Sequence, residues 1–84
     1  MNAAHLRDVG GIWTICGVNN DNELALGTIT GVHVAQIGSR NITLMHEHYL
    51  KGKNIWNICE YADNKLVCSR WDQAHLYLID RTSP

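Results

Sequence analysis

The chain has 84 residues, of which 18% are charged, and its formal net charge is −1. This length allows at most one small domain, and the charge excludes a nucleic-acid-binding protein that works through a strongly basic surface. The hydrophobic content of 45% excludes an acidic disordered tail. No apolar run is long enough to span a bilayer, so we expect no membrane as a partner. From the net charge we expect no nucleic acid as a partner either.

Short apolar runs between turn-forming residues predict seven strands, and no window shows the period of a helix. The turns contain Gly, Asn, Asp and Ser, which tolerate turn backbone angles. In chain order, the expected strands cover residues 12–16, 23–27, 31–37, 42–45, 55–60, 65–69 and 74–79. The segment 45–50 could instead form a helical turn.

The chain contains three cysteines, and its first eight residues lack the apolar core of an export signal. An odd number of cysteines cannot pair completely within one chain. These features predict reduced thiols and a cytoplasmic or nuclear location. Since Cys16, Cys59 and Cys68 show no CxxC spacing, we expect small buried apolar residues and not a zinc site.

Two halves of the chain repeat each other. The pattern Ile-Trp-x-Ile-Cys that begins at Ile12 recurs 43 residues later, at Ile55. One residue is then lost, and at an offset of 42 His33 aligns with His75. The alignment has ten identities over about 33 positions, where average composition gives roughly two by chance. Four short strands in about 42 residues is the period of a propeller blade.

The repeat resembles the WD40-type β-propeller family. The residues that carry this resemblance in the second copy are His48, the strand 55–59, the run Leu66-Val67-Cys68-Ser69, Asp72 and the run Leu78-Ile79-Asp80. The tryptophan of the family's third strand is replaced by Ile37 and Ile79, and the turn aspartate of the first copy is Thr30. The family's His–Ser–Asp–Trp hydrogen-bond network is therefore incomplete in both copies.

The resemblance implies an all-β fold of two propeller blades, each with four antiparallel strands. We expect one two-blade unit over 1–84, with the first blade at about 6–46 and the second at about 48–84. Residues 1–5 would form a strand that completes a neighbouring blade. Two blades cannot close a ring and would leave apolar faces in water. The ring would be completed by a homo-oligomer of three or four chains, or by the rest of a larger propeller.

Several histidines could serve as metal ligands or as acid–base groups, but their positions in the repeat favour structural roles. His5 and His48 precede the first strand of each copy at equal distances, which suits residues that fix a blade by hydrogen bonding. The sequence His46-Glu47-His48 lacks the helical HExxH spacing and a third ligand, so we expect no metal and no cofactor. Polar residues that repeat in both copies also argue against a catalytic site, so we expect no enzyme.

The family resemblance places the ligand face on the loops before the first strand and between the second and third strands. The residues of these loops predicted to bind are Arg70, Trp71, Asp72, Lys51, Lys53 and Arg7. Trp71 is an apolar anchor flanked by charges, and the slight excess of cations suits an acidic or phosphorylated peptide. The same residues could instead be an ordinary solvated rim.

We therefore expect a non-catalytic protein–protein interaction scaffold. The alternative is a carbohydrate-binding propeller lectin assembled from two-blade chains. In that case Trp13, Trp56 or Trp71 would stack on sugar rings. The structural alternative for Trp13 and Trp56 is that they pack between blades and bind no ligand.

Overall fold

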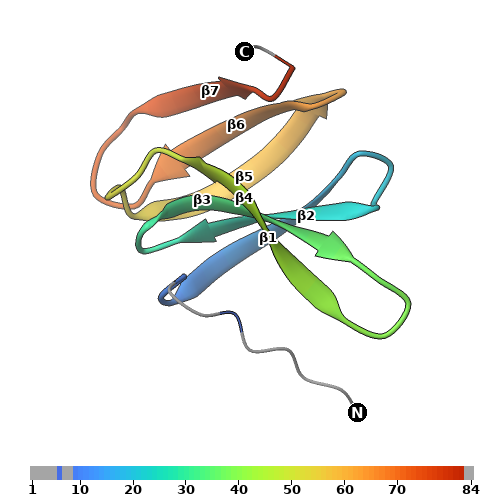
Figure 1. The fold of residues 1–84 in the computed structure, drawn as a ribbon. Coiled ribbons are helices and arrows are strands. Elements are labelled where there is room, and N and C mark those ends of the chain that lie inside the picture. The colour runs from blue at the N-terminus through green and yellow to red at the C-terminus, as the bar shows by residue number, and fades with distance from the viewer. Residues whose placement is uncertain (1–5, 7–8, 83–84) are drawn as a thin grey trace.

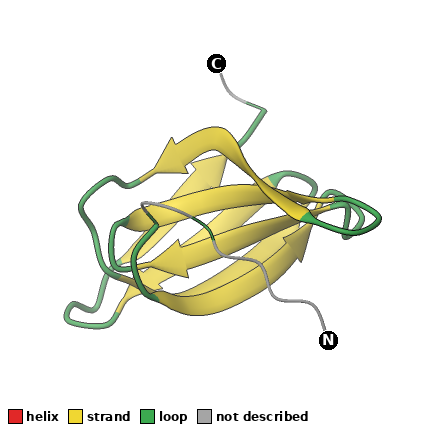
Figure 2. Cartoon of the chain, turned by 60° about the horizontal axis from the view of Figure 1, so that its bottom comes forward, coloured by secondary structure: helices red, strands yellow, loops and turns green. Residues whose placement is uncertain are grey.

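The computed structural model describes Leu6 and residues 9–82, which form strands and loops (Figures 1 and 2). The strands are β1 Ile12–Val18, β2 Glu23–Thr28, β3 Gly31–Ile37, β4 Ile42–Tyr49, β5 Ile55–Ala62, β6 Lys65–Arg70 and β7 Leu76–Asp80. All seven predicted strands are confirmed, and the segment considered for a helical turn is the second half of β4. In the described part of the chain there is no helix with the length and apolarity needed to cross a membrane.

The strands form two antiparallel sheets, which lie one above the other in Figure 1. The first sheet has the order β1-β2-β3-β4, and the second has the order β5-β6-β7. Because β4 runs to Tyr49, the first sheet extends three residues beyond the predicted end of the first blade. Residues 1–5, predicted to be a strand of a neighbouring blade, lie outside the described residues.

The sequence repeat reappears in the pairing of the first two strands of each sheet. Thr28 pairs with Ile12 in the first sheet, and Arg70 pairs with Ile55 in the second. In both pairs the register shifts at the tryptophan that follows the isoleucine, which marks a β-bulge. The two copies therefore share a local backbone irregularity as well as an apolar pattern.

The third strands of the two copies align differently from the prediction. His33 pairs with Leu26, and at the equivalent place in the second sheet Cys68 pairs with Tyr77. The predicted equivalence of His33 with His75 is therefore wrong by two residues. The physical reason is the length of the loop, since six residues separate the paired Ser69 and Leu76, whereas four separate the equivalent pair Gly27 and Val32.

The two sheets pack face to face around one apolar core. Its buried residues come from the facing sides of both sheets and are Val18, Ala25, Val32, Ile55, Ile58, Leu66, Cys68 and Ile79. Gly27 allows a close approach of the sheets, because a Cβ atom there would lie 3.2 Å from the carbonyl oxygen of Ile55 and 2.5 Å from Thr14 Cγ2. The missing side chain lets the start of β5 lie directly on β2.

A charged cluster joins the ends of the two sheets. Arg81, whose side chain is 7% exposed, follows β7 and reaches the first sheet. Its Nη2 atom donates to Glu23 Oε1 at 2.9 Å and to Glu47 Oε1 at 2.8 Å, and its Nε atom donates to Glu47 Oε2 at 2.8 Å. Its Nη1 atom donates to Asn64 Oδ1 at 3.1 Å. These hydrogen bonds from Arg81 lower the pKa of Glu47 and raise that of the arginine.

A second polar cluster, at the start of β3, contains a buried histidine. The His33 ring stacks on the His48 ring with centroids 4.0 Å apart. The Thr30 hydroxyl donates to the Val9 carbonyl oxygen at 2.8 Å, so His33 Nε2 is the donor in its 2.9 Å contact with the Thr30 hydroxyl. His48 Nε2 donates to the Thr30 carbonyl oxygen at 2.9 Å. His48 thus has the structural role predicted for it.

Replacing Arg81 with methionine should destabilise the fold strongly. The substitution leaves two carboxylates without their cation, and breaking a buried ion pair in this way costs about 3–5 kcal/mol of unfolding free energy. Urea unfolding measures the change, and Arg81→Lys, which keeps the charge but not the bidentate geometry, should lose less. A loss below about 1 kcal/mol in Arg81→Met would show that the cluster does not hold the sheets together.

Stability should fall as the pH decreases below about 6.5, the ordinary value for histidine. Burial, with a smaller effect from the charge of His48, lowers the pKa of His33 in the folded chain. The unfolded chain therefore binds more protons in this range, and unfolding free energy is lost by at most about 1.4 kcal/mol per pH unit for one proton. Urea unfolding between pH 7.5 and 5.5 measures the slope. The slope should shrink in His33→Gln but persist in the control His46→Gln, which changes an exposed residue.

Candidate functional site

Three loops meet at one end of the two sheets, which we name the loop end. It consists of the turn 29–30, the loops 50–54 and 71–75, and the first residues of β1 and β5. The Gly52 amide donates to the Thr30 carbonyl oxygen at 3.0 Å, which joins the first two loops. The pairing of Ile55 with Arg70 brings the third loop to the same end.

All three tryptophans lie at the loop end. Trp13 and Trp56, the bulged residues of β1 and β5, contact each other with ring centroids 5.2 Å apart and planes tilted by 44°. This contact joins the two sheets at their loop end, yet each indole remains 50% exposed. Trp71, in the loop after β6, is 64% exposed. Tryptophan is enriched at binding interfaces because its ring combines a large apolar surface with a hydrogen-bond donor.

The charged residues beside Trp71 are held in a fixed arrangement. Arg70 Nε donates to Asp72 Oδ1 at 3.1 Å, and Arg70 Nη2 donates to Asp72 Oδ2 at 3.0 Å. The two parallel hydrogen bonds link the residues on either side of Trp71, so they restrain the backbone that carries the indole. Hydrogen bonding with Tyr77 is the main cause that raises the pKa of Arg70.

Lysine and histidine side chains extend this cluster toward β7. The Lys53 Nζ atom lies 5.7 Å from the centroid of the Tyr77 ring, a cation–π distance. The exposed His75 ring lies edge-on to the same tyrosine at 6.2 Å. Tyr77 was not among the predicted site residues, because its only sequence signal is its place two residues after His75 in a predicted strand.

The structure brings together five of the six residues predicted to bind. Arg70, Trp71 and Asp72 are consecutive, and Lys53 reaches them through the Tyr77 ring. Lys51 is exposed in the same loop as Lys53. Arg7, the sixth, lies outside the described residues.

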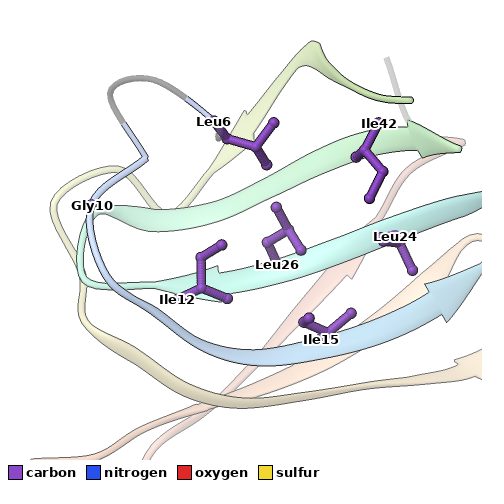
Figure 3. Close-up of a pocket in the computed structure, with 7 residues that line it drawn as sticks. All are labelled: Leu6, Gly10, Ile12, Ile15, Leu24, Leu26 and Ile42. Atoms are coloured by element: carbon purple, nitrogen blue, oxygen red, sulfur yellow. The ribbon is translucent and has the colours of Figure 1, made fainter. Parts of the chain in front are cut away.

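An apolar hollow, which the sequence analysis missed, lies on the outer face of the first sheet. It has a cavity volume of 320 Å³, and Figure 3 shows the residues that line it, namely Leu6, Gly10, Ile12, Ile15, Leu24, Leu26 and Ile42. Leu26, only 2% exposed, forms its floor, whereas Ile15 is 59% exposed. The missed signal is that Ile12 to Cys16 is apolar at odd and even positions, which is typical of a strand covered on both faces.

The expectation of buried cysteines holds for Cys68 but is wrong for Cys59, which is exposed, and Cys16 is half-buried. Burial raises the pKa of Cys16, and it raises that of Cys68 to about 12, so both thiols stay protonated and weakly nucleophilic at neutral pH. Glu47 is held by Arg81 and by the Tyr49 hydroxyl, which donates to it at 2.6 Å. Among the residues that the structure describes, no three His, Cys, Asp or Glu side chains are grouped to hold a metal ion.

Comparison with known proteins assigns no family to this arrangement. No protein-family model, no curated protein sequence and no solved structure matches the chain.

Proposed function

We propose that the chain is a non-catalytic protein–protein interaction module that binds an acidic peptide segment of its partner at the loop end. In this proposal the two sheets are propeller blades of the WD40 type, and the module works in the cytoplasm or nucleus. The three free cysteines support a reducing compartment. The observation that carries the binding proposal is Trp71, an indole that is 64% exposed although its loop is restrained on both sides.

Exposed tryptophans with nearby arginine are typical anchors of protein interfaces. Trp71 offers a large apolar surface, and the Arg70–Asp72 pair limits the freedom that it would lose on binding. A preordered anchor gives more affinity than a mobile one, because less side-chain and loop entropy is lost when the complex forms.

The charges of the loop end favour an acidic ligand. Lys51 and Lys53 add two cations, whereas the carboxylate of Asp72 is already paired with Arg70. The net local charge is therefore positive although the whole chain carries −1. Acidic residues next to an apolar side chain would match both the cations and the indole. A phosphorylated peptide is the more highly charged form of the same ligand.

Trp71→Ala should weaken peptide binding while leaving the fold intact. An array of random 12-residue peptides, probed with the labelled chain, would identify ligands, and titration would give the affinity. We expect acidic peptides to be selected, and a loss of about 2 kcal/mol, or roughly 30-fold in affinity, in the variant. Because Trp71 is exposed, the unfolding free energy should change by less than about 0.5 kcal/mol.

Tyr61→Ala is the matched control, since Tyr61 is 54% exposed near the turn between β5 and β6, at the opposite end of the sheets. It should bind peptides as the unchanged chain does. Equal losses in the two variants, or selection of basic peptides, would contradict the proposed site. Global unfolding of Trp71→Ala in circular dichroism would assign Trp71 to the core instead.

The alternative function, a carbohydrate-binding lectin, is favoured by one observation. Trp13 and Trp56 are paired at the loop end and remain half exposed, so together they offer an aromatic surface on which a sugar ring could stack.

Titration with sugars separates the two functions. If the peptide-binding proposal is right, tryptophan fluorescence should stay unchanged when mono- and oligosaccharides are added, and a glycan array should show no binding. A saturable fluorescence change that disappears in Trp56→Ala but persists in Trp71→Ala would establish the lectin function instead.

A further inference from the structure

The packing between the two sheets joins different faces of the repeat. In the first sheet, Cys16, Ala25 and Val34 lie opposite one another on three neighbouring strands, and they share the face turned toward the second sheet. The equivalent trio in the second sheet is Cys59, Val67 and Leu78. That trio lies on the face turned away from the first sheet, so the internal interface joins one face of the first copy to the opposite face of the second.

The trio of the first sheet is covered, and its equivalent in the second sheet is not. Ala25 and Val34 are fully buried, whereas Leu78 is 71% exposed. The neighbouring pair differs in the same way, because Val32 is fully buried and its equivalent Leu76 is 75% exposed. We name this uncovered surface, formed by Cys59, Val67, Leu76 and Leu78, the donor face.

The opposite face shows the reverse difference. Ile58 and Leu66 are buried in the core of the molecule, at 6% and 0% exposure. Their equivalents in the first sheet, Ile15 and Leu24, line the open hollow on the outer side, and Ile15 is 59% exposed. We name this hollow, lined by the seven residues given above, the acceptor face (Figure 3).

Ile55 and its repeat equivalent differ in exposure in the same way. Ile55 is fully buried against Gly27. Its repeat equivalent, Ile12, is 44% exposed at the rim of the hollow. Each side chain of the internal interface thus has an equivalent in the other copy of the repeat. The equivalents of one side of the interface lie on the outer surface of the second sheet, and those of the other side lie on the outer surface of the first sheet.

We propose that the donor face of one chain docks on the acceptor face of a second copy of the same chain, in the manner of the internal interface. The docked copies would continue the stack of sheets, with Leu76 and Leu78 of one chain covering Ile15 and the hollow of the next. Such a contact joins two different surfaces and is therefore heterologous. It would close a ring of three or four chains, which continues the order of sheets already present inside each chain.

Leu78 and Ile15 are the positions to change, because each is strongly exposed in the single chain and belongs to one of the two faces. Leu78→Asp removes the donor face, and Ile15→Asp removes the acceptor face. Ser39→Asp is the matched control, since it adds the same charge in the exposed turn between β3 and β4. Circular dichroism and urea unfolding verify that all three variants stay folded.

The test is the mass in solution, by light scattering behind a sizing column. We expect the unchanged chain and Ser39→Asp to give three or four times the monomer mass of 9.5 kDa, and each of the other variants alone to give the monomer. An equal mixture of Leu78→Asp and Ile15→Asp retains one intact donor face and one intact acceptor face. The mixture should therefore form a dimer of one copy of each variant.

Three results would overturn the proposal. The first is a monomer for the unchanged chain at concentrations up to about 1 mM, where even weak association with a Kd in that range would be visible. The second is loss of association in one variant only, which would indicate that one face pairs with itself. The third is a mixture of the two variants that remains monomeric. If the 12-residue peptides bind the loop end of a monomeric chain, the proposed function stands although this assembly fails.

Discussion

The close approach of β5 to β2 over Gly27 is the constraint on which the rest of the structure depends. A side chain at this position would meet Thr14 and the backbone of Ile55, so the separation of the two sheets is set where no side chain intervenes. Closing this gap buries Ile55 and lets Ile58 and Leu66 reach the apolar side of the first sheet. Burial of aliphatic side chains is the main favourable term in such a small fold.

The same packing positions the groups at both ends of the sheets. At the loop end it brings Trp13 onto Trp56, because the bulges of β1 and β5 lie side by side. At the other end it brings Arg81 to Glu23 and Glu47 of the first sheet. Apolar burial is not directional, whereas the ion pairs of Arg81 connect particular residues of the two sheets.

The proposed binding surface and the proposed assembly use different parts of the molecule and support each other. The loop end lies at the edges of the sheets, while the donor and acceptor faces are the broad outer surfaces. In a ring formed by the proposed contact, the loop ends of all copies would lie on one side. A partner with several acidic segments would then bind more tightly than a single segment does, through an increased effective concentration.

The sequence by itself determined the strands, the repeat and the group of residues at the loop end. Alternating apolar runs show the period of two of a strand, short continuous runs are recognised by their length, and turn residues such as Asn64, with its positive φ, show where strands stop. Arg70, Trp71 and Asp72 could be placed in one loop because they are adjacent in the chain. The length of that loop could not be aligned, because two extra turn residues leave no periodic signal, and His33 was matched with the wrong partner.

Only the tertiary structure decided which apolar residues are buried and which polar groups meet. Leu76 and Val32 are similar side chains at equivalent places, but Leu76 is exposed whereas Val32 is buried, because only Val32 belongs to the core between the two sheets. Arg81 and Glu23 are 58 residues apart, and nothing in their local sequence indicates that they meet. Burial depends on what covers a side chain, and that is a property of the packed sheets which no local pattern contains.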